Sequence, residues 1–105
     1  MVLAAELTQA ELEPLFEVLA AQWHDEADGL SLTYRKVTHP AYLKIIGLGP
    51  RVVPLIVEDL RERGGWWFAA LEALTRENPA SSLDSGHPEA VKAAWLQWAD
   101  ARRNE

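Results

Sequence analysis

The sequence predicts an all-α fold, a compact bundle of about five helices. Apolar residues recur at steps of three and four in five segments, as on one face of a helix. Proline and glycine lie at the borders of these segments, where helices begin and end. The chain has 105 residues, 49% of them apolar, which suits one domain with a sizeable core. We therefore expect a single domain over residues 1–105, with helices near 8–27, 39–47, 50–63, 65–76 and 87–103.

The first helix carries its own start signal. Thr8 and Glu11 have the spacing of a capping box, in which two side chains bond the first free amides of a helix. Pro14 leaves two alternatives: a helix that bends at Pro14, or a short turn at 8–12 before a helix that begins near Pro14. The apolar residues that follow at helical spacing predict a buried face: Leu12, Leu15, Phe16, Leu19 and Trp23.

The charge of the chain is concentrated in this first helix. Residues 1–28 hold seven acids and no Lys or Arg, while the other 77 residues hold nine acids and ten bases, so the first quarter accounts for the net charge of −6. This distribution disfavours direct nucleic-acid binding, which needs clustered Lys and Arg. The helix is either a solvated face or a surface that docks on a basic protein. The acids proposed for such contacts are Glu13, Glu17, Asp25 and Glu26.

Residues 29–40 are predicted to connect the first two helices. Apolar and polar residues alternate there in the manner of a strand, but no partner strand is evident. We therefore expect an extended connector, with Leu32 and Tyr34 packed against helices. Tyr34, Arg35 and Lys36 form either a partner-binding loop or the connector's own anchors.

The segment from His39 to Asn78 is the predicted scaffold. Pro50 suits the first turn of a helix that runs to Arg63, and Pro54 predicts a bend in it. Gly64 and Gly65 end this helix. Apolar residues lie on one side of this helix. The other side carries charged residues that we expect to be exposed: Glu58, Asp59, Arg61, Glu62 and Arg63.

The next helix begins with two adjacent tryptophans. Trp67, Leu71 and Leu74 share a face and belong to the predicted core. Trp66 points about 100° away on a helix. It either packs on the last helix against Trp95 or Trp98, or stays partly exposed as an interface anchor.

The central pair of predicted helices is similar to one HEAT-type hairpin. It consists of a proline-bent helix, a short turn and a helix of the form WxxALxALT. The preceding AYLKIIGLG resembles the second helix of a foregoing hairpin. Such repeats need about three copies to bury a continuous core. The chain holds fewer, so we expect the end helices to cover the central pair.

Three motifs in order carry a closer resemblance: HPAYxxIIGxGxxVVPLI, WWFxALxxxTxxNP and AWLxW, over residues 39–98. They resemble a family of small uncharacterised bacterial proteins of about this length. The resemblance implies no activity for any residue. The chain departs from the expected pattern at TREN and at its end, where ADARRNE lacks a glycine after AWLxW.

The sequence offers few residues for catalysis. Cysteine is absent, and His24, His39 and His87 are far apart without a metal-binding spacing. His39-Pro40 and His87-Pro88 instead mark helix starts, the second after a loop at 77–86. No phosphate-binding glycine loop or nucleophile elbow is present. We expect no enzyme, no cofactor and no metal.

The expected function is binding to another protein. Apolar runs are too short to cross a membrane, and no secretion signal is evident, so we expect a cytoplasmic location. One version is an acidic, antitoxin-like inhibitor that covers a basic partner; another is an adaptor that binds through apolar grooves and Trp66. An unrecognised enzyme or ligand-binding protein is the third alternative. The predicted core is Phe16, Leu19, Ile45, Ile46, Val53, Ile56, Val57, Leu60, Trp67, Leu71, Leu74, Val91 and Trp95.

Overall fold

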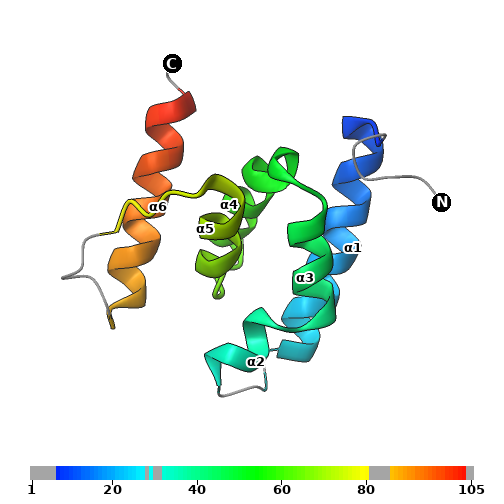
Figure 1. The fold of residues 1–105 in the computed structure, drawn as a ribbon, viewed down its shortest axis with the longest axis horizontal. Coiled ribbons are helices and arrows are strands. Elements are labelled where there is room, and N and C mark those ends of the chain that lie inside the picture. The colour runs from blue at the N-terminus through cyan, green and yellow to red at the C-terminus, as the bar shows by residue number, and fades with distance from the viewer. Residues whose placement is uncertain (1–6, 28, 30–31, 81–85, 104–105) are drawn as a thin grey trace.

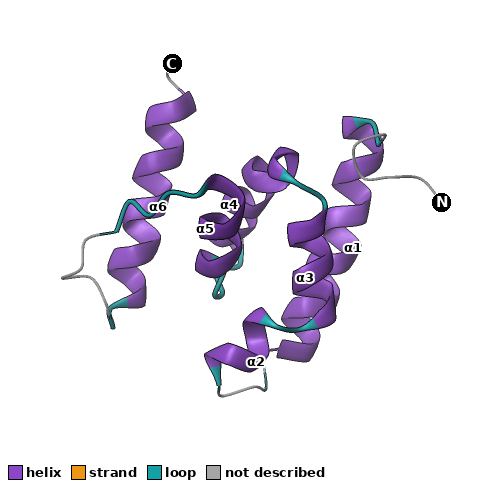
Figure 2. Cartoon of the chain, in the orientation of Figure 1, coloured by secondary structure: helices purple, strands orange, loops and turns teal. Residues whose placement is uncertain are grey.

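A computed structural model describes residues 7–27, 29, 32–80 and 86–103 and confirms the all-α class. Every described element is a helix, as Figure 2 shows, and the five predicted segments each contain one. One additional short helix lies between the first two segments.

The helices lie in a row across a flattened molecule of 44 × 38 × 22 Å (Figure 1). At one end α1, Gln9–Ala27, packs along α3, Pro40–Gly47. The centre holds α4, Val53–Glu62, and α5, Phe68–Thr75, which form the predicted hairpin. At the other end α6, Pro88–Arg103, packs on α4. Helix α6 thus covers the central pair as expected, whereas α1 packs mainly on α3 and reaches the start of α5 through the rings of Phe16 and Trp23.

The start of α1 is the predicted capping box. The Thr8 hydroxyl accepts from the amide of Glu11 at 3.2 Å, and the Glu11 carboxylate accepts from the amide and hydroxyl of Thr8 at 3.2 and 2.9 Å. These bonds lower the pKa of Glu11. The helix runs through Pro14 from Gln9, so the alternative of a start near Pro14 is excluded. Leu15 is 38% exposed, at the edge of the buried face rather than within it.

The predicted extended connector is wrong at residues 33–37, which form the short helix α2, Thr33–Val37. Both expected anchors are exposed, Leu32 by 59% and Tyr34 by 74%. The helical turn directs other groups inward: the carbonyl of Lys36 accepts from the Trp23 indole at 2.8 Å, and Val37 packs on the core. The alternation was misleading because so short a run of apolar and polar residues fits a single helical turn as well as a strand.

Pro50 lies between α3 and α4, and Pro54 lies in the first turn of α4. Gly49 has a φ of 90°, which favours glycine, and Pro50 then begins the short 3-10 helix η2, Pro50–Val52. Pro54 falls in the first turn of α4, where its missing amide costs no helical bond. The predicted bent helix is therefore a 3-10 turn followed by a helix that starts three residues later.

The turn after α4 depends on glycine. Gly64 and Gly65 have φ values of 75° and 100°. A Cβ on Gly65 would lie 3.1 Å from the Trp23 ring and 3.2 Å from His24, so a side chain there would push α1 away. After this turn α5 begins at Phe68, so that Trp66 and Trp67 precede the helix.

The core joins all the long helices. Most predicted core residues are buried, while Ile46, Val53, Leu74 and Val91 are half-buried against it. Further buried residues, which the predicted core list does not contain, complete the core: Leu12, Ala20, Trp23, Ala27, Ala41, Tyr42, Val52, Phe68 and Ala70. The predicted loop continues from Glu77 to Ala80 without helix, and its residues 81–85 lie outside the described part.

Among the described residues, no single helix has both the length and the apolar composition needed to cross a membrane. Only the combined segments Pro40–Gly47 and Pro50–Glu62 have this length and composition, and the chain bends by 107° between them.

The burial of Leu71 can be tested against an exposed leucine. Leu71→Ala should lower the free energy of unfolding by about 2–5 kcal/mol, because it leaves a cavity at a fully buried position. Leu43→Ala should change it by about 0.5 kcal/mol or less, because Leu43 is 51% exposed. Urea denaturation measures both, and equal losses would contradict this core.

Candidate functional site

The most buried charge in the described part of the chain is Asp59, only 5% exposed. The prediction that Asp59 is exposed is wrong. It lies three residues after Ile56 and seven after Val52, both fully buried, so it shares their face of the helix. This face is turned toward α1 and the Gly64-Gly65 turn.

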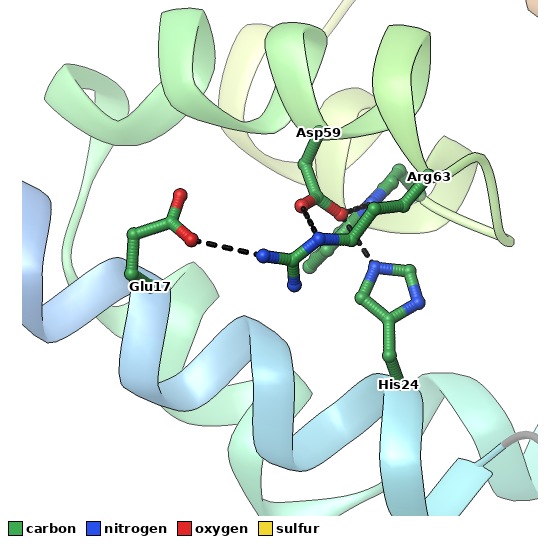
Figure 3. Close-up of polar contacts among 5 residues, drawn as sticks. Glu17, His24, Asp59 and Arg63 are labelled. Atoms are coloured by element: carbon green, nitrogen blue, oxygen red, sulfur yellow. Dashed lines mark hydrogen bonds and ion pairs between the residues drawn. The ribbon is translucent and has the colours of Figure 1, made fainter.

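Three donors surround the Asp59 carboxylate, as Figure 3 shows for His24 and Arg63. Its Oδ2 accepts from Nε1 of Trp67 at 2.9 Å and lies 2.5 Å from Nε2 of His24. Its Oδ1 lies 3.4 Å from Nε of Arg63. Arg63 also donates to Glu17 on α1 at 3.1 Å. The network ties α1 to the end of α4 and to the start of α5.

Trp67 links this network to an aromatic cluster. Its ring lies 4.4 Å from that of Trp23 and 5.5 Å from that of Tyr42, centre to centre, and it stacks nearly parallel to Tyr42. The Tyr42 hydroxyl donates to the carbonyl of Trp66 at 2.8 Å and accepts from the amide of Ala70 at 2.9 Å. Both bonds fix the turn that precedes α5.

The hydroxyl of Tyr42 is buried as a neutral group. Burial raises its pKa well above the ordinary value, and the amides of Ala70 and Ala69 offset only part of this rise. Tyr42 is therefore a structural hydrogen-bonding group at neutral pH.

The pairing of His24 with Asp59 is the arrangement most like acid–base machinery. Both carboxylate oxygens are already engaged in holding Trp67 and Arg63, which favours a structural role. The space beside His24 is a hollow of about 70 Å³, smaller than the sites that hold substrates. Within the described ranges, no three His, Asp or Glu side chains gather as a metal site would require.

A larger concavity lies between α5 and the start of α6. This Trp66 groove has a volume of about 690 Å³. Trp66 and Phe68 pack edge to face at one wall, with ring centres 5.0 Å apart, and Trp95 lies at the other. The groove is lined by Trp66, Phe68, Ala69, Glu72, Asn78, Ala80, Gly86, His87, Pro88, Val91 and Trp95.

A second groove, of about 380 Å³, lies between α4 and the end of α6. Trp98 lines it, and the Arg102 guanidinium lies 4.4 Å from the centre of its ring. The buried indole N–H groups of Trp95 and Trp98 have no acceptor among the described residues. Each groove of α6 is therefore lined by a tryptophan whose buried indole N–H has no acceptor among these residues.

The predicted contact residues do not form one surface. Glu17 is paired with Arg63, and Glu26 lies 3.1 Å from His39, which caps α3. Glu13 and Asp25 are exposed. On α2, Tyr34 and Arg35 are exposed, whereas Lys36 is half-buried. Trp66 is half-buried, so it packs on the core and also lines a groove.

Sequence reasoning missed the Asp59 network, and it named apolar grooves and Trp66 without locating the grooves. The heptad spacing from Val52 to Asp59 could have indicated a buried carboxylate. The grooves depend on how α6 crosses the hairpin, which no local pattern encodes.

Comparison with family models, curated proteins and solved structures found no match for the chain. The structure thus defines a class, a small all-α protein with a buried polar network and grooves beside its last helix. The resemblance over residues 39–98 to a family of small bacterial proteins stays a prediction.

The bond from Trp67 to Asp59 can be tested with a matched tryptophan. Trp67 and Trp95 are both fully buried, but in the part of the chain that the structure describes only Trp67 has a partner for its indole N–H. Trp67→Phe should destabilise the fold by about 1.5–3 kcal/mol more than Trp95→Phe, the value of a hydrogen bond to a charged group. Equal losses in urea denaturation would show that this bond contributes nothing.

The raised pKa of Tyr42 predicts a loss of stability in alkali. Its folded-state pKa lies above the unfolded value of about 10, so its contribution is complete below pH ~10 and is lost as the pH rises further. Tyr42→Phe should be less stable at pH 7 but should show a shallower decline above pH 10. Tyr34→Phe, at an exposed position, should retain the wild-type slope in chemical denaturation.

Proposed function

We propose that the protein is a non-catalytic binding module that holds an apolar segment of a partner protein in the Trp66 groove. The observation that carries this proposal is the groove itself, whose walls include Trp66, Phe68 and Trp95. Aromatic side chains in concave, water-excluding surroundings are typical of the residues that dominate interface energies.

The half-buried state of Trp66 supports this role. A tryptophan that packs on the core keeps a fixed orientation, so little side-chain entropy is lost when a partner binds. Its main-chain carbonyl is held by Tyr42, and its ring packs on Phe68. Trp66 is thus a rigid anchor at the edge of the groove.

The unused indole donor of Trp95 adds a second reason. A buried N–H without an acceptor costs about 1–3 kcal/mol. A partner's backbone carbonyl at the groove wall is the kind of group that would satisfy it after a small side-chain movement.

The electrostatic version of the function has less support. Of the four acids proposed on the first helix, Glu17 and Glu26 are engaged within the molecule. Only Glu13 and Asp25 are left for a basic partner among these four. Salt separates the two versions, because exposed charges are screened over about 8 Å at physiological ionic strength, whereas apolar contacts are not.

The test is site-specific photo-crosslinking in the native cells. A crosslinking amino acid at Ala69, which lines the groove, should capture a specific partner. The same group at Ala73, exposed on the same helix and outside the groove lining, should not. Equal capture at both positions, or none at either, would contradict the groove as the binding site.

Trp66→Ala should weaken binding of the captured partner by about 2 kcal/mol or more, roughly thirtyfold in affinity, if Trp66 is an anchor. High salt should change the affinity little. Glu13→Lys together with Glu17→Lys serves as the comparison variant, and loss of binding there but not in Trp66→Ala would favour the acidic-helix version. Melting temperatures of all variants control for unfolding.

A further inference from the structure

A smaller pocket adjoins the Trp66 groove and has a different chemistry. Its volume is about 210 Å³, and it shares Trp66, Phe68 and Pro88 with the groove. Its other lining residues come from the end of α2, the turn after α4 and the start of α6: Lys36, Gly64, Gly65, Glu89 and Lys92. We refer to it as the lysine pocket.

The two lysines bring positive charge together in an acidic protein. Lys36 and Lys92 are both half-buried, and neither forms an ion pair with any residue that the structure describes. Glu89 is the one carboxylate in the lining, so the ammonium groups outnumber it. With a net charge of −6 on the chain, such a cluster is contrary to the overall composition.

The turn after α4 lines the pocket with Gly64 and Gly65. Lys92 lies over this turn, with its Nζ 4.0 Å from the position that a Cβ on Gly64 would take. The amide of Gly64 donates to the carbonyl of Asp59. The amides of Gly65 and Trp66 have no acceptor among the described residues. Successive amides in such a turn are a known setting for anions.

We propose that the lysine pocket binds a carboxylate of the partner segment whose apolar side chain lies in the Trp66 groove. Two ammonium groups in one pocket match a carboxylate, which accepts up to four hydrogen bonds. The shared wall of Trp66 and Phe68 places charge and apolar recognition side by side. This inference rests on the proposed function, which it deepens by naming the partner's chemistry.

The carboxylate has two possible sources, the C-terminus of the partner or an acidic side chain. Three synthetic peptides distinguish them: acetyl-Gly-Leu-Phe with a free carboxylate, the same peptide as its C-terminal amide, and acetyl-Gly-Glu-Phe amide. Each is titrated into the full-length ¹⁵N-labelled protein at low ionic strength. The readouts are the affinity and the amide resonances of Gly65 and Trp66.

At least one of the two carboxylate peptides should bind about tenfold more tightly than the Leu-Phe amide, a difference of about 1.4 kcal/mol. It should also shift the Gly65 and Trp66 resonances. Preference for the free acid alone identifies a C-terminus, and preference for the Glu peptide identifies a side chain. Equal binding of all three peptides would overturn the proposal.

Lysine variants give the matched control. Lys36→Met with Lys92→Met should abolish the tenfold preference, whereas Lys44→Met, at an exposed position on α3, should retain it. The single variants are measured as well, so that poor folding of the double variant cannot hide the result. Equal loss in Lys44→Met would show a general charge effect and would overturn the proposal.

Inorganic phosphate tests for an unspecific anion site. If phosphate alone shifts the same resonances with the affinity of the peptides, a peptide carboxylate is not the ligand.

The proposal for the groove and the proposal for the lysine pocket can be contradicted separately. If the Ala69 crosslink forms equally in the double lysine variant, the groove is supported as the binding site and the carboxylate site is contradicted. If the carboxylate peptides bind with the expected preference but Ala69 captures no partner, the carboxylate site is supported and the groove is contradicted.

Discussion

The carboxylate of Asp59 is the constraint on which the packing of the N-terminal two thirds of the described chain depends. A charge taken out of water is costly unless donors surround it, and removing one donor leaves the penalty in place. Here the donors come from His24 on α1, from Arg63 at the end of α4 and from Trp67 before α5. Apolar burial is non-directional, whereas this network accepts only one relative placement of the three elements.

The other end of the molecule is held differently. Helix α6 contacts mainly α4, through apolar side chains and an exposed bond of 3.1 Å from Arg61 to Asp100. Exposed pairs of this kind contribute little. Within the described ranges the buried indole N–H of Trp95 has no acceptor, and grooves lie between α6 and α5 and between α6 and α4. The molecule thus combines one end that is fixed by a buried polar network with another whose buried contacts are apolar and whose polar contacts are exposed.

Much of the fold could be predicted because its signals are local. The Thr8–Glu11 box and the His39-Pro40 start follow from neighbours within a few residues, and both are present. The connector failed because alternation in a short stretch cannot distinguish a strand from a single helical turn, and α2 is fixed by the distant Trp23. Asp59 was misplaced because its charge suggested water. The lysine pocket unites residues 36, 64 and 92, which only the tertiary fold brings together.

The residues of the aromatic cluster and of the Asp59 network lie far apart along the chain, which matters while the ribosome makes the protein. Trp23 and His24 are made early, but the groups that cover them, Asp59 and Trp67, follow some 35 to 44 residues later. While the ribosome supplies that interval, α1 and α3 can pair but their aromatic face has no cover. Domains fold as units, and newly made chains with exposed apolar surface are prone to aggregate. The aromatic face of α1 therefore stays uncovered in a nascent chain until the start of α5 has been made.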